Sequence, residues 1–144
     1  MVKEVKGEFV QTMVVDYQLI HYGCPLNDFF YFIGGATDQA FRRQHLVNLK
    51  ELYYSTMKNY LEYFDMDIET EFPRWHFEED YKRRMNYALI TGLLFMPFFM
   101  AAEDSVPDFS EVDLIDVDIR INDNEAFKER VLGLVEDFEN WGYL

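Results

Sequence analysis

The chain has 144 residues, 49% hydrophobic and 18% aromatic, which is enough for one folded domain with its own core. Its 13 basic and 27 acidic residues give a formal charge of −14, which disfavours nucleic acid because that binding needs Lys and Arg to neutralise phosphates. Cys24 is the single cysteine and excludes an intrachain disulfide, and the N-terminus "MVKEVKGEF" has no apolar signal core, so a cytoplasmic location is expected.

The N-terminal segment predicts a β-hairpin over residues 3–16. Its "VKGE" contains a turn glycine, and "FVQTMVVDY" is a run rich in β-branched residues that ends at Asp16. A short helix over residues 26–33 is expected next, capped by Asn27 or Asp28 and ended by the glycines 34–35. This helix is apolar nearly all round, which predicts burial.

A long helix follows, capped by Thr37 or Asp38 and running to about residue 64. The basic pair Arg42–Arg43 is interpreted as part of a solvated face, as is the basic run 82–84. Apolar and aromatic residues recur at three- and four-residue spacing and predict the buried face: Phe41, His45, Leu49, Leu52, Tyr53, Tyr60 and Phe64.

Two more helices complete the expected fold, which is mainly α with a short N-terminal β-hairpin. One starts near Phe77 and continues with a kink near Pro97; its apolar run 88–102 is shorter than the ~20 residues of a membrane span and predicts a buried core helix, with a membrane-associated role as the alternative. The other runs from about Glu125 to Trp141, capped within 122–124 and closed by Gly142.

Several chemistries find no support in the sequence. No GxxxxGK[ST], GxGxxG, HExxH or GxSxG motif occurs. The acids of "DMDIETEF" fail as a calcium loop, because position 6 is Thr70 and position 12 is His76, so a helix end with solvated acids is preferred. The three histidines lack metal-ligand spacing and Cys24 has no sequence partner, which favours structural roles.

Asp16 and Asp28 are the candidate site residues. An aspartate at the end of a buried strand can project its carboxylate into a cleft, where a Mg²⁺ ion that bridges nucleotide phosphates needs a rigid ligand. Asp28, at the start of the helix that carries "FFYFI", can cap free N–H groups and connect this helix to the neighbouring loop.

The stretch "VVDYQLIHYGCPLNDFFYFI" resembles the "hhDFQ…yG.p..DLhyfh" segment (h for apolar) of the ecdysteroid kinase-like, or CHK kinase-like, family, which is related to choline and aminoglycoside kinases. "YALITGLLFMPFFMAAED" and "FKERVLGLVEDFENWGYL" resemble later helices of the same family. The resemblance implies Mg²⁺ and ATP as cofactors, Asp16 as the metal ligand of a DFG-like position, and Asp28 as a structural brace of the catalytic loop.

The chain departs from the family because it contains no HGD or HRD catalytic loop, so no catalytic residue is assigned and the nucleotide-binding residues are unknown. Residues 1–144 are expected to form one domain, the C-terminal portion of a CHK kinase-like domain and part of a protein kinase-like C-lobe. The expected function is that of a truncated or degenerate family member, inactive alone; the alternative is a non-enzymatic helical module that binds a lipophilic small molecule or a protein.

The surface that a catalytic loop would cover in a complete kinase is expected to be exposed around Phe9, Val14, Phe29 and Phe32. Exposed apolar patches of this kind mark partner sites. Self-association or binding of the missing lobe is therefore expected, with no nucleic-acid partner and no transmembrane segment.

Overall fold

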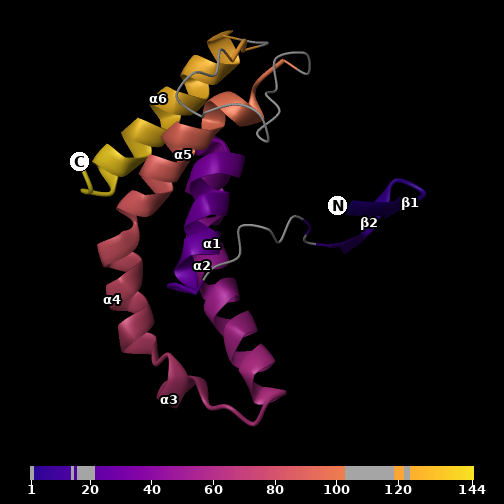
Figure 1. Cartoon of the computed structure of the whole chain (residues 1–144), viewed down its shortest axis with the longest axis vertical. Helices are drawn as coiled ribbons and strands as arrows, with labels where there is room; N and C mark the ends of the chain where they lie inside the picture. Colours follow the sequence, from indigo (N-terminus) through magenta and orange to yellow (C-terminus); the bar gives the residue numbers. More distant parts are fainter. Residues whose placement is uncertain (1, 14, 16–21, 103–118, 122–123) are drawn as a thin grey trace.

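The computed structural model describes residues 2–13, 15, 22–102, 119–121 and 124–144. Its described part is mainly helical with one two-stranded sheet, as predicted (Figure 1). The hairpin pairs β1 (Val2–Val5) antiparallel with β2 (Glu8–Thr12), and both turn residues have positive φ, 53° at Lys6 and 82° at Gly7. A two-residue turn in which both residues have positive φ has a backbone twist that matches the right-handed twist of the strands. This explains why "KG" closes the hairpin. Asp16, at its predicted end, lies outside the described residues.

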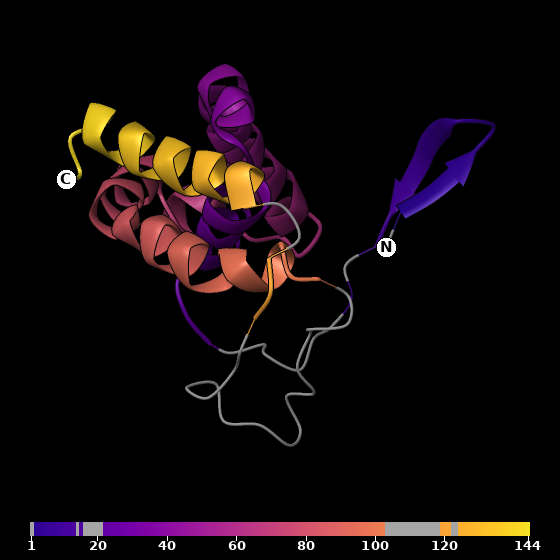
Figure 2. The ribbon, with the colours of Figure 1, turned by 90° about the horizontal axis from the view of Figure 1, so that it is seen from above.

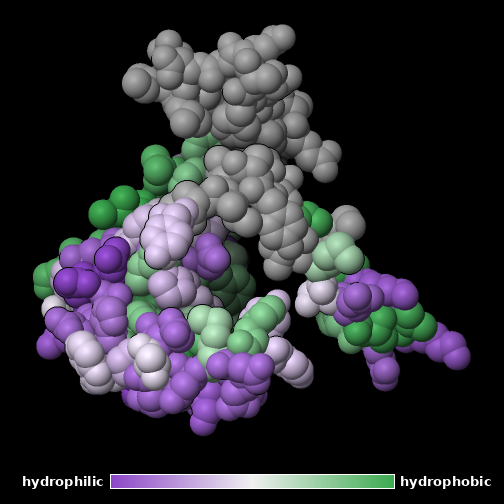
Figure 3. Space-filling model, turned by 60° about the horizontal axis from the view of Figure 1, so that its bottom comes forward, coloured by the Kyte–Doolittle hydropathy of each residue, from purple (hydrophilic) through white to green (hydrophobic). Residues whose placement is uncertain are grey.

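The hairpin stands apart from the helices, as the ribbons of Figures 1 and 2 and the space-filling view of Figure 3 show. Every strand residue is exposed, including Phe9 at 77%. An isolated two-stranded hairpin is only marginally stable in water, because no third strand or helix packs on it and covers its apolar side chains.

The first helix does not end at Gly34 and Gly35 as predicted. Helix α1 (Leu26–Tyr31) continues directly into the π-helical turn η2 (Phe32–Ala36). An added Cβ on Gly34 would lie 1.9 Å from the carbonyl oxygen of Ala88, so this glycine permits close helix packing and does not terminate the helix. The predicted cap is also wrong, because Pro25 occupies the N-cap position and no side chain caps the helix.

Helix α2 (Gln39–Glu62) begins as predicted, since the Asp38 carboxylate accepts a hydrogen bond of 2.7 Å from the Phe41 N–H. Its predicted buried face is wrong in part. The buried residues are Arg42 and Tyr54, whereas Leu52 and other members of the predicted face are exposed. The face that packs on the core is rotated from the predicted one: it contains Leu46, Met57 and Leu61 together with the buried Arg42, which hydrophobic periodicity does not detect.

The predicted third helix is two helices. Helix α4 (Arg74–Arg84) begins directly after Pro73, and α5 (Asn86–Phe99) follows a break at Met85 and contains Pro97. Figure 1 shows α2 and α4 as two arms joined through the short helix α3 (Ile68–Glu71). The Asp67 side chain accepts the Glu69 N–H at the start of α3, so the acidic run here belongs to a helix end, as expected.

Helix α6 (Asn124–Asn140) confirms the predicted C-terminal helix, and Gly142 follows it with a φ of +77°. It lies along α5 in both ribbon views (Figures 1 and 2). The core lies where α1, η2 and the helices α2 to α6 meet. Its buried hydrophobic residues are Leu26, Phe29, Phe30, Ile33, Tyr54, Ile68, Phe72, Phe77, Met85, Ala88, Met96, Leu134 and Phe138.

Helix α5 is not the fully buried helix that its composition predicts. Gly92 and Met96 face the core, but Ile90 and Leu94 are 63% and 57% exposed. Only one side of α5 has helices packed on it in the described part of the chain, so its apolar composition exceeds what the fold buries.

Candidate functional site

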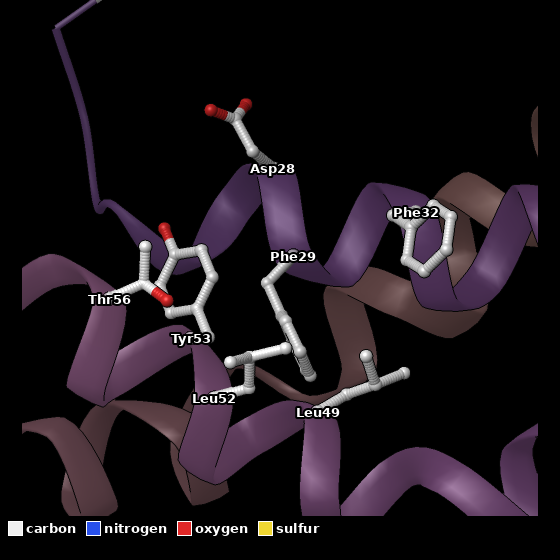
Figure 4. Close-up of a pocket in the computed structure, with 7 residues that line it drawn as sticks. All are labelled: Asp28, Phe29, Phe32, Leu49, Leu52, Tyr53 and Thr56. Carbon is white, nitrogen blue, oxygen red and sulfur yellow. The ribbon is translucent and has the colours of Figure 1, made fainter. Parts of the chain in front are cut away.

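A shallow pocket of about 350 Å³ lies between α1 and α2 (Figure 4). Residues Asp28 to Phe32 form one wall, and residues 49 to 56 of α2 form the other. Figure 4 shows the Asp28 carboxylate directed away from the apolar side chains, at the rim. The residues lining the pocket are Asp28, Phe29, Phe32, Leu49, Leu52, Tyr53 and Thr56.

Aromatic contacts hold the two walls together. The rings of Phe29 and Tyr53 have centroids 5.4 Å apart, and the Tyr53 hydroxyl donates a hydrogen bond to the carbonyl oxygen of Pro25. Burial, with a smaller contribution from the nearby Asp28 carboxylate, raises the pKa of Tyr53 to about 12. Tyr53 is therefore a neutral hydrogen-bond donor that anchors α2 to the start of α1, and it does not act as a base.

Asp28 lies exposed in the first turn of α1. It makes no side-chain hydrogen bond within the described part of the chain. A carboxylate in the first turn of a helix is favoured by the free N–H groups there, which explains how an unpaired acid is tolerated beside an apolar pocket. Its role as a brace for a catalytic loop stays a prediction.

Asp16, the predicted metal ligand, lies outside the described residues, so its geometry relative to Asp28 is not defined. Among the described residues, no three His, Cys, Asp or Glu side chains come together in a way that could hold a metal ion. Mg²⁺ sites use carboxylates together with substrate phosphates. No step of phosphoryl transfer is assigned to the described residues, and Mg²⁺ and ATP stay a prediction.

Asp80 is the centre of a polar cluster that the sequence interpretation missed. Its carboxylate is 4% exposed and accepts hydrogen bonds from Arg83 and, at 3.4 Å, from Arg84. Burial acts to raise the pKa of this carboxyl, but the two arginines outweigh it and hold the pKa below its usual value. The i, i+3 and i, i+4 spacing of Asp80 to the basic run is the signal that could have revealed the cluster.

Cys24 connects the start of α1 to this cluster. Its thiol lies 3.7 Å from the Asp80 carboxylate and donates to it. Burial, together with Asp80, raises the pKa of Cys24. The thiol is therefore protonated near neutral pH and unsuited to nucleophilic catalysis, in agreement with the predicted structural role.

Arg42 forms a second buried polar contact, so the interpretation of the pair 42–43 as solvated is wrong for Arg42 and holds for Arg43, whose side chain is 55% exposed. Its Nε lies 2.8 Å from Asp137 Oδ2 of α6, and its Nη1 donates to the Thr37 carbonyl oxygen at 2.7 Å. Both side chains of the ion pair are at most 2% exposed. This pair fixes α2 against α6 and lies away from the pocket, so it is structural.

Residues 1–66 match the family model of the ecdysteroid kinase-like family. The matched segment contains the hairpin, α1, η2 and all of α2. Both walls of the pocket therefore lie in the matched segment. Comparison with curated proteins and with solved structures gave no significant match.

The matched segment ends before α3, so the match does not test the expected likeness of the later helices, the relation to choline kinases or the assignment to a C-lobe. In the part of the chain that the structure describes, no helix has the length and apolarity needed to cross a membrane.

Proposed function

We propose that this chain derives from ATP-dependent small-molecule phosphotransferases and is a truncated or degenerate ecdysteroid kinase-like protein that does not transfer phosphate by itself. The observation that carries the proposal is the match of residues 1–66 to the ecdysteroid kinase-like family. In this proposal Asp16 corresponds to a metal ligand and Asp28 to a brace of the catalytic loop.

The inactivity of the chain alone follows from what phosphoryl transfer requires. The protein must position the acceptor and metal-bound ATP in line and neutralise the phosphate charge, which takes a base, metal ligands and a cation at the phosphates. The sequence has no HGD, HRD or GxxxxGK[ST] motif. One aspartate at position 16 cannot supply these functions together.

A transfer assay tests this proposal. The chain is incubated with Mg²⁺ and radiolabelled ATP in the presence of an ecdysteroid or choline, and labelled product is measured. We expect no product above a blank without protein. Product that is lost in the Asp16→Ala variant would contradict the proposal, because it would show that Asp16 works in an intact phosphotransfer site.

The open pocket favours a second candidate, a non-enzymatic module that binds a lipophilic small molecule. Phe29 and Leu49 give the pocket an apolar floor, and Phe32 and Leu52 are 45% and 60% exposed at its edge. Pockets of this size with apolar linings are typical of ligand sites.

Titration with the neutral dye Nile red tests this candidate. The Phe32→Glu variant should weaken dye binding at least tenfold, because it places a charge at the edge of the pocket. Val47→Glu is the matched control, since Val47 is 75% exposed on α2 outside the pocket. Equal binding by the wild type and both variants would exclude this pocket as the ligand site.

A further inference from the structure

A mostly apolar surface, the α2 stripe, runs along one side of α2. Its six residues fall within an arc of about 100° around the helix axis when one turn takes 3.6 residues. Leu52 and Tyr60 are 60% and 64% exposed. The α2 stripe consists of Phe41, His45, Leu49, Leu52, Thr56 and Tyr60.

Ion pairs connect the other sides of α2 to neighbouring helices. Lys50 pairs with Glu78 of α4, and Arg43 pairs with Glu136 of α6. Both ion pairs lie outside the α2 stripe, as do Leu46, Met57 and Leu61, which pack on the core. Beyond the wall formed by Phe29 and Phe32, no described element is packed on the α2 stripe.

The α2 stripe has a symmetric spacing. Successive members are separated by four, four, three, four and four residues. The stripe therefore has the same pattern when it is followed in either direction, with leucines at the centre and an aromatic residue at each end. Two such stripes in antiparallel orientation can therefore place the same residue pairs in contact on both sides of a two-fold axis.

We propose that a second copy of this chain docks on the α2 stripe, with the two α2 helices antiparallel. A two-fold axis between positions 50 and 51 then places Leu49 against the partner's Leu52. The same axis places Phe41 against the partner's Tyr60. Each apolar contact occurs twice, as in an isologous interface.

Asp28 supplies the polar complement to this arrangement. It lines the same pocket as Thr56, and Thr56 lies opposite the partner's His45. The Asp28 carboxylate therefore comes close to the partner's imidazole, and this contact is repeated by symmetry. Because Asp28 makes no hydrogen bond to a described residue, forming the contact breaks none of those bonds.

The expected interface is small. Helix α2 has 24 residues and is about 36 Å long. Standard interfaces bury about 800 Å² per partner, and one helix side with the α1 wall supplies less than this. The dimer is therefore expected to be weak and to form in proportion to protein concentration. This inference depends on the α2 stripe and not on the proposed phosphotransferase origin.

Sedimentation velocity over a range of protein concentrations tests the inference. Wild-type protein should shift from monomer to dimer as concentration rises. Leu52→Glu should weaken the dimer at least tenfold, because it brings charges to the centre of an apolar contact. Val47→Glu should leave it unchanged, and because Leu52 and Val47 are both well exposed, circular dichroism should show both variants folded.

Disulfide trapping tests the antiparallel register independently. In a Cys24→Ser background, a mixture of Leu49→Cys and Leu52→Cys chains should form a covalent dimer faster than either chain alone, and Val47→Cys should form none. The proposal is overturned by a wild-type monomer at every concentration, by a Leu52→Glu variant that dimerises like the wild type, or by a dimer in which positions 49 and 52 do not crosslink.

Discussion

The two sides of α2 differ in the chemistry that they present. One side is fixed to α4 and α6 by ion pairs, with Arg42 fully buried against Asp137 and Lys50 paired with Glu78. The other side is the mostly apolar α2 stripe, on which Leu52 stays exposed. The side that faces the core also carries Leu46, Met57 and Leu61, so apolar residues occur on both sides, and periodicity alone does not decide which of them faces the core.

The largest expected effect comes from breaking the buried ion pair. Asp137→Ala leaves the Arg42 guanidinium buried without its anion and should lower the free energy of unfolding by about 3–5 kcal/mol. Urea denaturation measures this change. Glu136→Ala is the control, since its contact with Arg43 is exposed and should contribute less than about 1 kcal/mol. Similar losses in both variants would show that the buried pair does not anchor α2.

A smaller effect is expected where η2 crosses α5. Gly34→Ala brings a Cβ against the backbone of Ala88, and over-packing of this kind costs about 1–3 kcal/mol. Gly35→Ala is the matched control, because its Cβ would meet the ring of Phe99, a half-exposed side chain that can move. Thermal unfolding should show a larger drop in midpoint for the Gly34 variant, and the reverse order would refute the close-packing role.

The Asp80 cluster predicts a pH-dependent effect. The arginines hold the Asp80 pKa below its usual value, so its stabilisation is present above the usual pKa of about 3.9 and is lost as pH falls through the lower, folded pKa. Asp80→Asn should lower the free energy of unfolding by about 1–3 kcal/mol at pH 7, and the difference from the wild type should shrink below about pH 4.

Denaturation of both proteins across this pH range is the measurement. Glu79→Gln, an exposed neighbour, should follow the wild-type profile. A constant difference between Asp80→Asn and the wild type from pH 7 to below pH 3 would refute the ionic origin of the stabilisation.

Local signals predicted the elements of the fold well. The turn at Gly7, the cap at Asp38 and the glycine at position 142 each depend on a few neighbouring residues, and the structure confirms them. Gly34 was misread because a packing glycine and a terminating glycine look alike until the neighbouring helix is known.

Long-range polar contacts were not predictable. Asp137 is 95 residues from Arg42, and nothing in the sequence pairs them. In the candidate site, Asp28 was correctly predicted to lie at the start of a helix. The pocket beside Asp28 was not predicted, because the face of α2 that lines the pocket was expected to be buried. The metal role of Asp16 stays a prediction.

The central claim is that α2 is anchored on one side and open to a partner on the other. The dependence of the thermal unfolding midpoint on protein concentration tests it most directly, because association of folded chains stabilises them by mass action. The midpoint of the wild type should rise with protein concentration, and that of Leu52→Glu should stay constant. A wild-type midpoint that does not change with concentration would contradict the claim.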